Sequence, residues 1–133
     1  GVLSPIYIDD LVDGIVLAAG LEAGSGQIFN LTGGQKVPAE EFFAHHMRWA
    51  GKSGRPRSFS TSAAIAIAET ARLLFRLAGR HTEANRQSML MLSKSESFSI
   101  EKARRVLGFE PQVDVEEGLR RTEQVLRERG LIA

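Results

Sequence analysis

Residues 6–15, with the sequence IYIDDLVDGI, decide the fold of this chain. The triplet Ile6-Tyr7-Ile8 is rich in β-forming side chains and predicts a short strand. Asp9 or Asp10 would then cap a helix that runs to about residue 21. Apolar side chains recur over one broad side of that helix, namely Leu11, Val12, Ile15, Val16, Ala18 and Ala19. A helix with so wide an apolar surface is typical of one that covers a sheet.

The next segments repeat the order of strand and helix. Residues 27–31 are apolar without clean alternation, which predicts a second strand that is covered on both faces. Pro38 opens a helix at its first position, and Gly51 ends it. Residues 58–60 predict a third short strand.

The remainder of the chain is predicted to be helical. We expect a long apolar helix over residues 63–78, ended by Gly79, and a shorter one from Thr82 or Asn85 to residue 92. Ser99 would cap a helix that ends at residue 107, and Asp114 with Glu117 forms a capping box for the last helix. The fold class is therefore α/β, mostly helical with two or three short strands. So few strands make a poor independent sheet, so we expect their partners on a further piece of chain.

Composition excludes several classes of protein. The 133 residues fit one domain or a large part of one, and the net charge of +1 creates no field that attracts nucleic acid. There is no cysteine, so disulfides and thiolate metal sites are excluded. We find no signal peptide and no apolar run that could span a bilayer, and we expect a cytoplasmic protein.

The first residues, GVLSP, contain no initiator methionine, and a strand-like stretch follows almost at once. A free-standing domain more often begins with a polar, poorly ordered segment. We therefore expect a chain cut from a longer one. Removal of a methionine before Gly1 is the alternative explanation.

The sequence contains no recognisable motif for a dinucleotide-binding loop, a metal site or a hydrolase nucleophile. Gly20, Gly24 and Gly26 lie between a helix and a strand, the reverse of the order that a dinucleotide-binding loop needs, and we interpret them as a turn. His45 and His46 are neighbours on a helix, so their side chains point in different directions and cannot share a metal ion. No serine has the context of a hydrolase nucleophile.

Three stretches carry a family resemblance. Residues 6–15 resemble the V-[HY]-V-x-D-[LV]-x-x-[AG] segment of the extended short-chain dehydrogenase/reductases. Residues 26–34, GQIFNLTGG, look like the strand and turn of that family with its Phe-Asn pair. Residues 98–111, FSIEKARRVLGFEP, are similar to its Lys-Ala-Arg and Leu-Gly-aromatic signature. The three stretches are in the family's order and at its spacing, and they span nearly the whole chain.

The resemblance implies that residues 1–133 are the C-terminal, substrate-side portion of a Rossmann-type NAD- or NADP-dependent oxidoreductase. In that family the first two-thirds holds the Gly-rich cofactor loop and a catalytic Tyr-x-x-x-Lys pair. Here the only tyrosine is Tyr7, and Leu11 stands four residues later, so the pair is missing. We therefore expect the chain alone to bind no cofactor and to be inactive. Its expected partner is the N-terminal dinucleotide-binding domain.

The resemblance also indicates a substrate class, through two positions at which this chain differs from relatives that act on nucleotide sugars. Relatives that act on nucleotide-diphosphate sugars have phosphate-binding arginines where this chain has, by our alignment, Leu3 and Met89. A diphosphate would be desolvated there without a partner, although Arg57 or Arg86 could substitute. Residues 61–92 instead look like the branch near the hydroxysteroid dehydrogenases. We therefore expect a small apolar alcohol or ketone as substrate, and a nucleotide-sugar epimerase or dehydratase is the alternative.

By the same alignment, the side chains expected to line the substrate pocket are Ser4, Tyr7, Phe59, Arg86 and Met89. Two other hypotheses stay open. The chain could be a non-enzymatic helical interaction module that self-associates through exposed apolar surface. Peripheral membrane association through the helix at residues 63–77 is also open, although that helix has only two arginines and no tryptophan.

Overall fold

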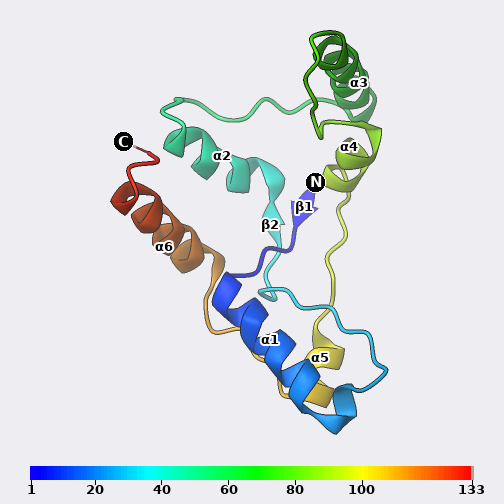
Figure 1. Cartoon of the computed structure of the whole chain (residues 1–133), viewed down its shortest axis with the longest axis vertical. Coiled ribbons are helices and arrows are strands. Elements are labelled where there is room, and N and C mark those ends of the chain that lie inside the picture. Colours follow the sequence, from blue (N-terminus) through cyan, green and yellow to red (C-terminus); the bar gives the residue numbers. More distant parts are fainter. Residues whose placement is uncertain (133) are drawn as a thin grey trace.

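A computed structural model describes residues 1–132. This part of the chain is mostly helical, with six α-helices, one 3-10 helix and two very short strands (Figure 1). In chain order the elements are β1 (Val2–Leu3), α1 (Ile8–Gly20), the 3-10 helix η1 (Glu22–Gly24), β2 (Val37–Pro38), α2 (Ala39–Trp49), α3 (Thr61–Leu77), α4 (Arg86–Leu92), α5 (Glu101–Leu107) and α6 (Val115–Glu128). All six helices predicted from the sequence are present, so the predicted mostly helical composition is confirmed.

The predicted strand positions are wrong. Residues 6 and 7 are in no strand, Ile8 already belongs to α1, and neither residues 27–31 nor residues 58–60 form a strand. The strands lie elsewhere, where Val2 pairs with Pro38 and Leu3 with Val37 in an antiparallel ladder. A β-forming composition becomes a strand only when a second backbone supplies hydrogen bonds, and these segments have no such neighbour within residues 1–132.

Local capping signals explain where three of the six helices begin. The side chains of Ser60, Asn85 and Asp114 accept hydrogen bonds from the backbone N–H groups of Ala63, Ser88 and Glu117, at 3.3, 3.1 and 2.8 Å. Each bond satisfies a donor that the first helical turn leaves free. The cap predicted at Asp114 is therefore confirmed, and of the two starts predicted for α4 the structure selects Asn85.

The predicted cap of α1 is wrong. Tyr7 is the N-cap residue and makes no side-chain capping bond. Asp10 is buried, and its two carboxylate oxygens accept the N–H groups of Gln112 and Val113 at 2.9 and 3.0 Å. A residue that the sequence assigned to helix capping thus joins α1 to the segment before α6.

The buried core is small and lies between α1 and α5. It consists of Ile100, Ala103, Leu107 and Phe109, and Leu17 and Leu31 pack against it. Phe109 has the largest fully buried side chain among the described residues. A Cβ atom on Gly14 would lie 2.8 Å from Leu31 and 3.1 Å from Phe109, so glycine lets α1 approach this cluster closely.

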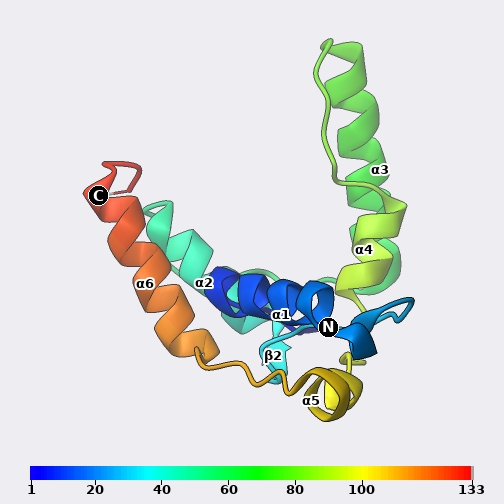
Figure 2. The same cartoon turned by 60° about the horizontal axis from the view of Figure 1, so that its bottom comes forward.

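The remaining helices extend away from this core. Figure 2 shows α3 rising from the rest of the molecule with α4 beside its base, and α3 packs extensively only against α4. On the other side α2 lies near α6, where the Trp49 indole donates a hydrogen bond of 3.0 Å to Glu123. Among the described helices, none is both long and apolar enough to pass through a bilayer.

One apolar side of α1 has no cover within the described chain. It consists of Ile8, Val12, Ile15 and Val16, which are 48–62% exposed, and we call it the α1 face. The sequence predicted that this helix covers a sheet, and residues 1–132 contain no sheet that this face could cover.

Candidate functional site

Two of the five predicted pocket residues come together. Phe59 and Met89 line one hollow of about 510 Å³ between the start of α2, the start of α3 and α4, although they are 30 positions apart in the sequence. Its other lining residues are Gly1, Pro38, Ala39, Glu40, Phe43, Pro56, Arg57, Ser58, Thr61, Ala64, Leu92 and Ser93. We call this hollow the Phe59 hollow and treat it as the candidate substrate site.

The Phe59 hollow combines an apolar wall with a few polar groups. Phe43, Phe59, Met89 and Leu92 supply the wall, and Phe59 is 54% exposed. Glu40 and Arg57 are its charged residues. Sites for small organic molecules commonly pair a mostly apolar lining with a small number of polar groups that set orientation.

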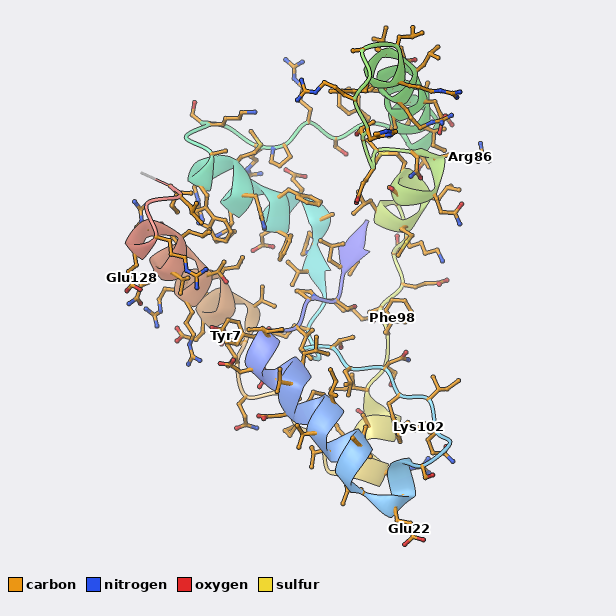
Figure 3. The ribbon with its side chains drawn as sticks, viewed as in Figure 1. Tyr7, Glu22, Arg86, Phe98, Lys102 and Glu128 are labelled. Atoms are coloured by element: carbon orange, nitrogen blue, oxygen red, sulfur yellow. The ribbon has the colours of Figure 1, made fainter. Side chains whose placement is uncertain are left out.

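Ser4 lines an adjoining hollow of about 300 Å³, together with Leu3, Met91 and Phe98. The two hollows share Leu92, so Ser4 lies on the other side of the end of α4 from Met89. Arg86 lines neither hollow. It lies at the start of α4 (Figure 3). Its backbone N–H donates to the Glu69 carboxylate of α3 at 3.0 Å.

Tyr7 lies apart from the Phe59 hollow, against α6. A Cβ atom on Gly118 would lie 3.2 Å from the Tyr7 ring, and the Arg121 guanidinium carbon lies 5.5 Å from the centre of that ring. Tyr7 also lines a small apolar pocket of about 160 Å³ between α2 and α6. The structure thus separates Tyr7 from Phe59 and Met89.

Sequence reasoning did not identify that small pocket. Phe42, His46 and Trp49 line it from α2, and Leu119 lines it from α6. The only indication in the sequence was the spacing of the three α2 residues, which places them on one face of a helix. Because the opposite wall comes from a helix some 70 residues later, no local pattern could indicate a pocket.

The two neighbouring histidines are engaged separately. His45 Nδ1 lies 2.6 Å from an Arg48 nitrogen, whereas His46 Nδ1 lies 3.0 Å from the Phe42 carbonyl oxygen. Partial burial, followed by the nearby Arg48 charge, lowers the pKa of His45 and favours its neutral form. Within residues 1–132, no three His, Cys, Asp or Glu side chains are grouped so that they could hold a metal ion.

No cofactor loop is formed by the described residues. Gly24 lies in η1 directly after α1, and a Cβ atom there would collide with the Ala18 carbonyl oxygen. This glycine therefore serves a tight turn after a helix, and the adjoining residues 25–30 form no strand.

The three stretches that carry the family resemblance fold against one another. The Asp10 carboxylate of the first stretch binds the backbone directly after the third. Asn30 of the second stretch donates to the Ser99 carbonyl oxygen at 3.4 Å, and the Lys102 ammonium donates to the Ile28 carbonyl oxygen at 3.0 Å. Residues spaced along nearly the whole chain therefore form one packed unit.

Comparison with known proteins shows the fold alone. No protein-family model matches the chain, and no curated protein matches it. The crystal structure of gox2253 superposes on 99% of this chain with a TM-score of 0.64 and 22% sequence identity. The chain covers 39% of gox2253, so it spans about two fifths of that protein's length.

Proposed function

We propose that this chain is the substrate-side portion of an extended short-chain dehydrogenase/reductase, with its NAD(P)-binding, Rossmann-type portion on a further part of the protein. The observation that carries the proposal is the convergence of the three motif stretches through Asp10, Asn30 and Lys102. Matches that arose by chance would have no reason to share hydrogen bonds and a core. The coverage of two fifths of gox2253 agrees with a portion of a larger unit.

The exposed α1 face supports the same proposal. Four apolar side chains on one side of a helix are costly to leave in water, by roughly 25 cal/mol for each Å² of apolar surface. A sheet from the dinucleotide-binding portion is the cover that the family resemblance implies for this helix. In that assembly the nicotinamide supplies hydride chemistry, and the present chain binds and orients the substrate and excludes water.

We further propose a small apolar alcohol or ketone as the substrate. Phe43, Phe59 and Met89 give the Phe59 hollow a wall that suits an apolar molecule, and a methionine side chain adapts to irregular shapes. Met89 occupies one of the two positions at which nucleotide-sugar enzymes would have a phosphate-binding arginine.

A nucleotide-sugar epimerase or dehydratase is the second candidate. Arg57 favours it, because this residue lines the same hollow as Met89 and could bind a diphosphate. Arg86 lines neither hollow beside α4 in this structure, so Arg57 is favoured over Arg86 as the substitute phosphate-binding residue.

The first experiment tests the parent enzyme. The coding sequence upstream of Gly1 is read for an in-frame Gly-rich loop followed by Tyr-x-x-x-Lys, and NADH and NADPH are titrated into the 133-residue chain by calorimetry. We expect both motifs upstream and no binding by the chain. A start codon at Gly1, or micromolar cofactor binding by the chain, would contradict the proposal.

The second experiment tests the substrate. The protein encoded by the whole reading frame is assayed with apolar ketones and with nucleotide-diphosphate sugars. We expect turnover of the ketones, a KM raised about tenfold or more by Phe59→Ala through lost apolar contact, and little change for Met91→Ala at an exposed position outside the Phe59 hollow. Turnover of nucleotide sugars alone, with loss on Arg57→Ala, would establish the second candidate instead.

A further inference from the structure

A second exposed apolar surface lies on α3, and it is distinct from the α1 face. Ile67, Leu73, Leu74 and Leu77 are 52–77% exposed, and their spacing places them on one side of the helix. Ala68 is buried and lies on the side toward α4, the helix against which α3 packs. We call the four exposed residues the α3 face. They are contiguous and point away from α4.

The polar group nearest the middle of the α3 face is satisfied within the helix. The Thr70 hydroxyl donates a hydrogen bond of 2.8 Å to the Ala66 carbonyl oxygen one turn earlier. A hydroxyl bonded in this way can enter an apolar environment at little cost, because its donor already has a partner.

Positive charge gathers around this helix. Residues 55–86 contain six arginines and two glutamates, whereas the rest of the chain contains 11 basic and 14 acidic residues. One of the two glutamates is neutralised locally, since Glu69 forms a 2.9 Å ion pair with Arg72 and accepts the Arg86 backbone N–H. These contacts lower the pKa of Glu69, first through the Arg86 hydrogen bond and then through Arg72.

Two of the arginines keep their charge available for a partner. Arg76 and Arg80 have no carboxylate partner within residues 1–132. The Arg80 guanidinium carbon lies 5.8 Å from the centre of the Phe75 ring, which holds this charge at the free end of α3. Arg80, just beyond the end of α3, and Arg86, which the packing of α4 places beside Glu69, thus add to the two arginines of the helix itself.

We propose that the α3 face binds the surface of an anionic lipid bilayer, with α3 lying in the headgroup layer and Arg76 and Arg80 at the lipid phosphates. An amphipathic helix with leucines on one side and arginines beside them has the composition of such interfacial helices. A second copy of this chain is a poorer occupant, because two such surfaces would bring like charges together.

The α1 face does not fit the same partner. Helix α1 carries Asp9, Asp10 and Asp13 and contains no basic residue, so anionic lipid would repel it. It is therefore a matched control, an apolar face of similar exposure with the opposite charge. The proposal goes beyond the reductase function and does not depend on it.

The test is vesicle flotation of the 133-residue chain, which separates lipid binding from aggregation. We expect the chain to float with vesicles of equal parts phosphatidylglycerol and phosphatidylcholine, to stay behind with phosphatidylcholine alone, and to bind less as salt rises. Leu74→Glu is expected to weaken binding at least about tenfold. Joint replacement of Arg76→Gln and Arg80→Gln is expected to weaken it about 25-fold, at about fivefold for each arginine.

Val16→Glu on the α1 face is the control, and binding should stay within about twofold of the unchanged chain. Because Leu74 is exposed, Leu74→Glu should keep the helical circular dichroism spectrum. The proposal is overturned if neither lipid mixture binds, or if both bind equally. It is also overturned if Val16→Glu abolishes flotation while Leu74→Glu does not, or if Leu74→Glu only converts a dimer to a monomer.

Discussion

At the scale of single residues, Asp10 holds two distant segments together. Its carboxylate is 3% exposed and accepts two backbone N–H groups from residues 112 and 113. We expect Asp10→Ala to lower the free energy of unfolding by about 2–3 kcal/mol, because two partly buried hydrogen bonds to one carboxylate are lost together. Urea denaturation followed by circular dichroism measures this. Asp13→Ala, at an exposed position of the same helix, is the control, and equal effects of the two changes would contradict the role of Asp10.

Phe109 is the residue on which the core most depends. Its side chain is 2% exposed and contacts the cluster of Ile100, Ala103 and Leu107. Phe109→Ala should cost about 3–5 kcal/mol in the free energy of unfolding, since it removes a large apolar side chain and leaves a cavity. Phe98→Ala, at a position that is 63% exposed, should cost less than about 1 kcal/mol in the same denaturation experiment. A similar loss for both variants would show that the core lies elsewhere.

At the scale of elements, α6 is stabilised by charge as well as by its cap. The Glu117 carboxylate accepts hydrogen bonds from Arg120 and Arg121, both at 2.7 Å, and these contacts lower the pKa of Glu117 to about 2. A carboxylate whose pKa is lowered by folding stabilises the fold above its unfolded pKa, and the stabilisation is lost as the pH falls toward the folded value.

The resulting pH dependence can be measured. The unfolding midpoint of the chain should fall as the pH is lowered from about 4.5 to 2, and Glu117→Gln should make that fall shallower. Some slope should remain, because arginines also lower the pKa of Glu110 and of Glu123. Glu116→Gln, which removes an exposed carboxylate that has no ion pair among the described residues, should keep the full slope. A variant slope identical to that of the unchanged chain would rule out this role for Glu117.

At the scale of the whole molecule, the uncovered α1 face should lead to self-association. Ile8, Val12, Ile15 and Val16 form an apolar surface that the described chain leaves in water. We expect the apparent mass in light scattering to rise with concentration, and Val12→Glu with Val16→Glu to restore a smaller species. A clean monomer that binds no dye for apolar surfaces would contradict this prediction.

The success of the sequence predictions depended on the distance between interacting residues. The cap at Asp114 bonds to a residue three positions later, so the sequence alone predicted it, and Asn85 caps in the same way at one of the two predicted starts of α4. The strand predictions at residues 6–8, 27–31 and 58–60 failed because pairing needs a second backbone that composition does not identify. Asp10 has the composition of a helix cap, yet its partners lie about 100 residues away.

The candidate site shows the same difference between what local sequence indicates and what distant contacts decide. Apolar character at Phe59 and Met89 was visible in the sequence, but only the packing of α4 beside the start of α3 makes them walls of one hollow. Tyr7 was assigned to the same pocket, and the structure separates it because its ring packs against Gly118 of α6.

The sequence by itself determined the six helices, the starts of α4 and α6 and the missing catalytic pair, because these follow from residue identity and from contacts within one or two turns. Only the tertiary structure decided that Asp10 binds the segment before α6, that Phe59 meets Met89, and that Arg86 lies beside Glu69 of α3. Each of these depends on how segments pack. Packing brings together residues that lie far apart in the sequence, and no local pattern of residues indicates such partners.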